Sequence, residues 1–137
     1  MATSKGSVTE FNESWRVRPE TAINFYQPKK ARNQIELTFQ QHYSFMREVV
    51  RVPKRGHVLD VGAGRGSMGQ YFAADGYRVT LLDTSDAALT SAERNFARYG
   101  HEGEFVVGDV LKMPFDDAAF DLVLSIGLLE HFRNVMN

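Results

Sequence analysis

The sequence predicts an α/β fold, a doubly wound, Rossmann-like parallel sheet with an N-terminal helical segment. After residue 56, short apolar runs typical of buried strands alternate with segments whose apolar residues recur at helical spacing. This alternation is typical of parallel sheets with helices on both faces. A glycine-rich turn follows the first run, and acidic residues stand at or just after the ends of three runs. With 137 residues, 43% of them apolar, the chain suits one small domain.

Composition divides the chain into three expected regions. Residues 1–14 are small and polar, and we expect a mobile tail there. Residues 15–56 form an expected N-terminal helical or lid segment, in which Phe25 and Tyr26 lie among charges and prolines. Residues 57–137 form the expected Rossmann-like domain.

One apolar stripe predicts a helix over residues 31–50. The stripe residues recur three or four positions apart, so they share a face that we expect to lie against the sheet. They are Ile35, Phe39, Tyr43, Met46 and Val50.

The elements of the domain follow in strict alternation. Strands are expected over residues 57–61, 78–83, 104–107 and 120–125. Helices are expected over residues 67–74, from the N-cap Ser85 to Gly100, and from about residue 128. In the second of these helices, a stripe is expected to be core: Leu89, Ala92, Phe96 and Tyr99.

Composition also limits the classes of partner. Sixteen basic and 17 acidic residues give a net charge of -1, so we expect neither a nucleic acid nor an anionic membrane as partner. The absence of cysteine excludes thiolate metal sites, and the four histidines lack metal-ligand spacing, so we expect no metal. No stretch approaches the ~18 apolar residues of a membrane span, and the polar N-terminus lacks a signal-peptide core. We therefore expect a soluble, cytoplasmic protein.

Residues 58–66 read Val-Leu-Asp-Val-Gly-Ala-Gly-Arg-Gly and form an expected strand-to-helix turn. Such a turn brings bare backbone and a helix N-terminus close to a ligand. Gly64, Gly66 and Gly69 also satisfy the G-x-G-x-x-G pattern of dinucleotide sites, a weak signal on its own. Asp60 argues against that class, because its carboxylate would repel a pyrophosphate but would suit a ligand with an ammonium and a sulfonium group.

Two further acidic residues stand at the edge where open parallel sheets bind ligands. Asp83 ends the second strand about 20 residues after the glycines, the spacing of a carboxylate that accepts ribose hydroxyls, and Thr84 beside it could line an adenine. Asp109 follows the third strand and could accept from the amine of adenine while Val110 stacks on the ring. Either aspartate could instead be an ordinary strand-end or N-cap residue.

The pattern Asp60-x-Gly62-x-Gly64-x-Gly66 resembles the first motif of class I S-adenosylmethionine-dependent methyltransferases. Residues 108–132 look like the small-molecule methyltransferases related to the ubiquinone and menaquinone biosynthesis enzymes, with Met113 in place of the usual Leu. The resemblance implies S-adenosylmethionine as cofactor, held by Gly62, Ala63 and Gly64 and by the acidic residues. It also implies that Ser125 and Ile126, just past the fourth strand, face the transferring methyl, although they could form only a turn.

The resemblance implies the strand order 3-2-1-4, with the sheet truncated after its fourth strand. The run over residues 122–126 would then be an unpaired apolar edge. Three explanations stay open: the sequence is part of a longer gene product, a second copy covers the edge in a homo-oligomer, or subunits exchange elements.

The function implied is transfer of a methyl group to a small-molecule acceptor. Because the cofactor supplies the activated carbon, the protein must place the acceptor, exclude water and take a proton from it. His131 is the best candidate for the general base, although a histidine in the first turn of a helix could be structural. Two alternatives stay open, a catalytically silent module that binds S-adenosylmethionine or S-adenosylhomocysteine (SAH) and an NAD-dependent oxidoreductase.

Overall fold

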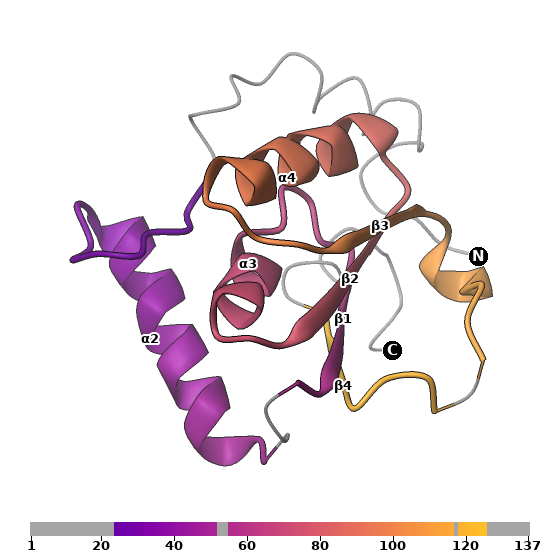
Figure 1. The fold of residues 1–137 in the computed structure, drawn as a ribbon, viewed down its shortest axis with the longest axis horizontal. Coiled ribbons are helices and arrows are strands. Elements are labelled where there is room, and N and C mark those ends of the chain that lie inside the picture. Colours follow the sequence, from indigo (N-terminus) through magenta and orange to yellow (C-terminus); the bar gives the residue numbers. More distant parts are fainter. Residues whose placement is uncertain (1–23, 52–54, 117, 126–137) are drawn as a thin grey trace, which may run out of the picture.

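The computed structural model describes residues 24–51, 55–116 and 118–125, and these contain a parallel sheet of four strands (Figure 1). Its order is β3-β2-β1-β4, which confirms the predicted fold class and strand order. The strands are β1 (His57–Val61), β2 (Arg78–Asp83), β3 (Glu104–Val107) and β4 (Leu122–Leu124). The first three have the predicted bounds. The fourth is shorter than expected.

Two crossover helices, α3 (Ser67–Ala74) and α4 (Asp86–Arg98), pack on the sheet. Buried side chains of both helices belong to one core cluster, so both helices lie on the same face of the sheet. On the other face, the described residues place the 3-10 helix η2 (Val110–Lys112) and the connection to β4. Helices on both faces are therefore not seen within the described part of the chain.

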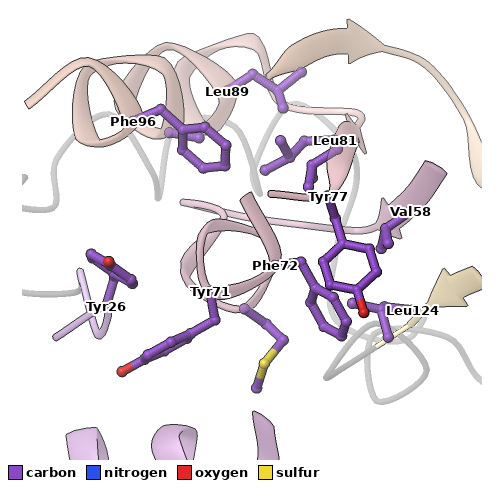
Figure 2. Close-up of a cluster of buried hydrophobic side chains, with 12 residues drawn as sticks. Tyr26, Val58, Tyr71, Phe72, Tyr77, Leu81, Leu89, Phe96 and Leu124 are labelled. Carbon is purple, nitrogen blue, oxygen red and sulfur yellow. The ribbon is translucent and has the colours of Figure 1, made fainter. Parts of the chain in front are cut away.

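The hydrophobic core consists of one cluster on each face of the sheet. The larger cluster joins the inner sides of α3 and α4 to Val58, Val79 and Leu81, and Figure 2 shows Phe72 and Phe96 pointing into it. The smaller cluster is centred on Leu59, Val61 and Leu82, with partly buried side chains packed against it: Val106, Val110, Phe115 and Phe120. Successive residues of β1 thus point to opposite faces, as strand geometry requires.

Helix α4 starts and ends as its sequence predicts, but its buried apolar stripe lacks the last residue of the predicted stripe and ends at Phe96. The Ser85 side chain accepts the N–H of Ala88 and caps the helix, while Leu89 and Phe96 are buried. The prediction that Tyr99 is core was wrong: it is the C-cap residue and 40% exposed. The helix ends there, so the 3.6-residue period no longer directs the side chain inward.

Helix α2 (Gln34–Val49) packs against α3 and not against the sheet as expected, and Figure 1 shows it on the outer side of α3. Phe39, Tyr43 and Met46 of the predicted stripe do contact the core. Ile35 was wrongly assigned to it, because it is 51% exposed while Glu36 is 2% exposed. The Glu36 carboxylate accepts hydrogen bonds from the Arg32 guanidinium and backbone, which explains how a charged group is buried there.

Asp121, just before β4, forms hydrogen bonds with the first residue of β1. The Asp121 carboxylate accepts the N–H of His57 at 2.7 Å, and the Asp121 N–H donates to the His57 carbonyl at 2.8 Å. The rings of Phe120 and His57 lie 4.4 Å apart. Phe120 and Asp121 therefore have a structural role at the start of β4. Among the described residues, no helix is long and apolar enough to cross a membrane.

Candidate functional site

The turn between β1 and α3 is folded back onto the end of β2. Gly62, Gly64 and Gly66 have φ angles of 65°, 59° and 74°, in the left-handed region that favours glycine. The N–H groups of Gly62 and Ala63 both donate to the Leu82 carbonyl, at 2.8 and 3.2 Å. The turn is thus a defined cradle of backbone at the carboxyl edge of the sheet, as the sequence predicts.

The later glycines of the motif are needed for packing. A Cβ atom on Gly66 would lie 2.4 Å from Leu81 Cδ2, and one on Gly69 would lie 3.1 Å from Asp60 Oδ2. Both positions let α3 lie close against the sheet. Packing alone therefore accounts for two of the three glycines in the G-x-G-x-x-G pattern.

Asp83 joins the glycine turn to the start of α4. Its Oδ2 atom accepts the N–H of Gly64 at 2.9 Å, and its Oδ1 atom accepts the N–H of Ser85 at 2.8 Å. The residue is buried, and a carboxylate can accept up to about four hydrogen bonds, so it is an acceptor of the kind that ribose hydroxyls need. The structure therefore places a negative charge directly beside the glycine turn.

Asp60 lies under the turn and has a partner within the protein. Its Oδ2 atom accepts the N–H of Gly69 in α3 at 3.1 Å, and the residue is 3% exposed. Burial raises the pKa of this carboxyl to about 7, against the lowering effect of the Gly69 hydrogen bond, and the nearby Asp83 charge raises the pKa further. Two carboxyl groups thus interact at the carboxyl edge.

The remaining predicted residues on β2 and β3 lie along the same edge. Asp109 caps η2, because its Oδ1 atom accepts the N–H of Leu111 at 2.9 Å. Val110 packs against the smaller core cluster, and Thr84 is half-buried between Asp83 and Ser85. The parallel register brings the ends of β1, β2 and β3 together, so these residues share one rim.

The start of α3 offers free donors to this rim. Gly66 caps the helix without a side-chain hydrogen bond, and the first turn carries no acidic residue. In the described residues, the N–H groups of Ser67 and Met68 have no acceptor. A helix N-terminus with free N–H groups favours a negatively charged ligand group such as a carboxylate.

The residues expected to face the methyl group are only partly placed. Ser125 follows β4 directly and is exposed. Ile126 and His131 lie outside the described residues. Sequence reasoning missed the roles of Ser67 and Tyr71, whose hydroxyls bind the segment before α2, because long-range contacts of this kind leave no periodic signal.

A cavity of about 530 Å³ lies at the opposite, amino edge of the sheet, near Tyr77, Val79 and Gly103. Arg78 in its wall is already paired with Glu104. Ligands of open parallel sheets bind at the carboxyl edge, and the acidic and glycine residues of the motif gather there. We therefore assign the candidate site to the carboxyl edge and not to this cavity.

Comparison with known proteins identifies the family of the chain. The sequence matches the family described as "Methyltransferase domain" over residues 58–136. It is 35% identical over 94 residues to malonyl-[acyl-carrier protein] O-methyltransferase of Enterobacter lignolyticus (strain SCF1), covering 64% of this chain and 36% of that protein. It is 38% identical over 85 residues to ajmaline N-methyltransferase of Rauvolfia serpentina, covering 59% of this chain and 29% of that protein.

A solved structure of coclaurine N-methyltransferase bound to N-methylheliamine and SAH has a TM-score of 0.76 and 18% identity, covering 98% of this chain and 42% of that one. At this identity the likeness concerns the fold alone. The chain spans about a third of the length of the curated relatives it matches. Because the family match covers more than half of the chain, the chain belongs to the methyltransferase domain family, among the class I S-adenosylmethionine-dependent methyltransferases.

Proposed function

We propose that the protein is an S-adenosylmethionine-dependent methyltransferase and that the carboxyl edge of its sheet holds the cofactor. The observation that carries the proposal is the contact between the Asp83 carboxylate and the Gly64 N–H. It places a charged acceptor beside a turn of bare backbone. That pairing fits a ligand with a ribose, and the Asp60 carboxyl under the same turn favours a nucleoside attached to an amino acid over a diphosphate, which an ionised Asp60 would repel.

Each residue of the rim has a part in this proposal. Asp83 accepts the ribose hydroxyls through its carboxylate. Gly62, Ala63 and Gly64 leave room for the amino acid portion, whose carboxylate the free N–H groups at the start of α3 favour. Asp60, whose pKa is about 7, supplies negative charge below the turn in its ionised form, which a positively charged ligand favours. At the adenine end of the rim, the proposed contacts are Thr84, Asp109 and Val110.

When bound, the cofactor supplies an activated methyl carbon and a neutral sulfur leaving group. The protein has to align the acceptor with that carbon, exclude water and accept a proton where the acceptor is a hydroxyl or an amine. Ser125 and Ile126 are the proposed lining on the methyl side. His131 is the proposed general base.

A small molecule is the proposed methyl acceptor, in a cytoplasmic setting. The relatives include malonyl-[acyl-carrier protein] O-methyltransferase and ajmaline N-methyltransferase, and a net charge of -1 offers no electrostatic attraction to nucleic acid. A second copy of the chain is the proposed cover for the edge of β4, where Val123 is exposed.

Calorimetric titration of the chain with S-adenosylmethionine, SAH and NAD tests the cofactor assignment. Both adenosyl ligands are expected to bind and NAD is not. Asp83→Asn should weaken SAH binding by about 2 kcal/mol, because it removes charge-assisted hydrogen bonds to the ribose. Glu93→Gln, an exposed carboxylate on α4, is the matched control and should bind SAH like the wild type.

The titration, together with a screen for methyl transfer, separates the proposed function from its two alternatives. Binding of both adenosyl ligands without methyl transfer in a screen of small acceptors would favour a silent binding module. Binding of NAD without SAH would revive the oxidoreductase, and equal SAH affinity of Asp83→Asn and wild type would remove Asp83 from the site.

A further inference from the structure

Residues 24–29 form a strap that crosses α3 and is held there by side chains. The N–H of Phe25 donates to the Ser67 hydroxyl at 3.0 Å, and the N–H of Gln27 donates to the Tyr71 hydroxyl at 3.0 Å. The Tyr71 hydroxyl in turn donates to the Phe25 carbonyl at 3.2 Å. Ser67 and Tyr71 are one helical turn apart, so a single face of α3 holds the backbone of the strap.

Helix α2 holds the strap from the other side. The Gln40 amide donates to the carbonyls of Gln27 and Lys29, at 3.0 and 2.7 Å. These bonds satisfy backbone groups of the strap that have no partner in a helix or a sheet. The strap therefore joins α2 to α3 through polar contacts of three side chains.

An aromatic anchor keeps the strap in this place. The Tyr26 ring is buried and lies 4.9 Å from the Tyr71 ring, 5.0 Å from the Tyr99 ring and 5.4 Å from the His101 ring. Figure 2 shows Tyr26 beside Tyr71 at the margin of the larger core cluster. The burial of this ring also explains why the segment, which is neither helix nor strand, takes one defined course.

The strap reaches the glycine turn through Ser67. This residue directly follows Gly66, and its side chain binds the strap while its backbone N–H is one of the free donors at the start of α3. Two residues further along α3, the N–H of Gly69 donates to the Asp60 carboxylate of the sheet. The position of the first turn of α3, and with it the glycine turn, thus depends on contacts to the strap on one side and to the sheet on the other.

We propose that Ser67 and Tyr71 are positioning residues, which act through the strap to hold the glycine turn in its ligand-binding geometry. This inference rests on the proposed function, because it assigns cofactor binding to that turn. A strap that stabilises the bound geometry is itself stabilised by the ligand to the same degree, since coupling between two sites is reciprocal. Cofactor binding and attachment of the strap therefore strengthen each other.

The test uses Tyr71→Phe, with Tyr99→Phe as its matched control. Both variants lose a hydroxyl from a ring that packs on Tyr26, but in the described residues the Tyr99 hydroxyl has no hydrogen bond. Trypsin cleavage after the exposed Lys29 and Lys30, followed by mass spectrometry of the peptides, reports release of the strap. Calorimetric titration with SAH measures the ligand affinity, which reports whether the glycine turn keeps its binding geometry.

In the wild type, saturating SAH is expected to slow cleavage at these two lysines. Tyr71→Phe should be cleaved there about fivefold faster without ligand and should bind SAH more weakly by up to the same factor, since a neutral hydrogen bond contributes about this much to an opening equilibrium. Tyr99→Phe should behave as the wild type in both measurements. Ser67→Ala provides a second variant with the same expected direction.

The outcomes separate this inference from the proposed function. If SAH binds the wild type but leaves cleavage unchanged, or if Tyr71→Phe and Ser67→Ala both bind SAH as the wild type does, the coupling is overturned and the cofactor site stands. If SAH does not bind the wild type, the proposed function fails and the coupling fails with it.

Discussion

The glycine turn and the N-terminal segment both attach to α3, but different interactions hold them. The turn is set by backbone hydrogen bonds to β2 and by close glycine packing against the sheet. The segment over residues 24–49 is set by polar side chains that reach across to backbone, and by the ion pair between the exposed Arg32 and the buried Glu36. The first arrangement follows from the fold itself. The second can be removed one side chain at a time, which makes the two regions separable by experiment.

The largest loss of stability on substitution is expected from closing the space that α3 uses to approach the sheet. Gly66→Ala would place a methyl group 2.4 Å from Leu81 at a φ of +74°. Backbone strain costs about 1 kcal/mol, and overpacking of the core adds about 1–3 kcal/mol. Urea denaturation should therefore show a loss of about 3 kcal/mol in the free energy of unfolding.

Gly100→Ala is the matched control for this change. Gly100 has a nearly equal φ of +72°, but a Cβ there meets nothing within 4 Å. It should lose only the strain contribution of about 1 kcal/mol. Equal losses in the two variants would show that packing at the turn does not matter.

Under the turn, Asp60→Asn should change how stability depends on pH. The folded pKa of about 7 lies above the ordinary value of 3.8, so the contribution of this carboxyl is full below the unfolded pKa and is lost as pH rises through the folded pKa. Asparagine can still accept the Gly69 N–H and carries no charge. Relative to the variant, the wild type should lose up to about 4 kcal/mol between about pH 4 and about pH 8, since each unit of a pKa difference corresponds to about 1.4 kcal/mol.

Denaturation series at several pH values measure this difference. Parallel curves for Asp60→Asn and the wild type would mean that the buried carboxyl does not titrate in this range. Such a result would contradict the raised pKa of the Asp60 carboxyl.

The N-terminal segment should respond in the opposite direction and more weakly. The hydrogen bond from Arg32 lowers the pKa of Glu36 to about 2, from an ordinary value of 4.5. This contribution is present above the unfolded pKa and is lost as pH falls through the folded pKa. Glu36→Gln should lower Tm by a few degrees above about pH 5, and the difference should disappear toward about pH 2.

Glu48→Gln, an exposed position on the same helix, controls for loss of charge from α2. Thermal scans of the three proteins make the comparison. A deficit of Glu36→Gln that persists unchanged at the lowest pH would show that the ion pair with Arg32 is not its source.

The same contrast explains how far the sequence could predict the structure. In the sheet region, apolar periodicity predicted the bounds of β1, α3, β2 and β3, because backbone ladders and burial decide them. In α2, apolar periodicity gave the wrong buried residue in the first turn. Glu36 is buried there in an ion pair with Arg32, and Ile35 is exposed. Two other features depend on contacts between distant residues, which no local pattern encodes. They are the packing role of Gly66 and Gly69, and the hydrogen bond by which Asp121 holds the start of β4 to β1.

The candidate site divides in the same way. Placement of Asp60, Asp83 and Asp109 along one rim follows from strand order, which the sequence indicated. The internal partners of these carboxylates, Gly69, Gly64 and Leu111, emerged only from the folded chain. Their contact with a cofactor stays a prediction.

The central claim is that the adenosyl cofactor binds at the carboxyl edge of the sheet, beside the glycine turn. Nuclear magnetic resonance of the ¹⁵N-labelled chain during titration with SAH tests it most directly. The backbone amide signals of Gly62, Gly64 and Val110 should shift, while those of Arg78 and Gly103 at the amino-edge cavity stay in place. Shifts confined to Arg78 and Gly103, or no shifts at saturating SAH, would contradict the account.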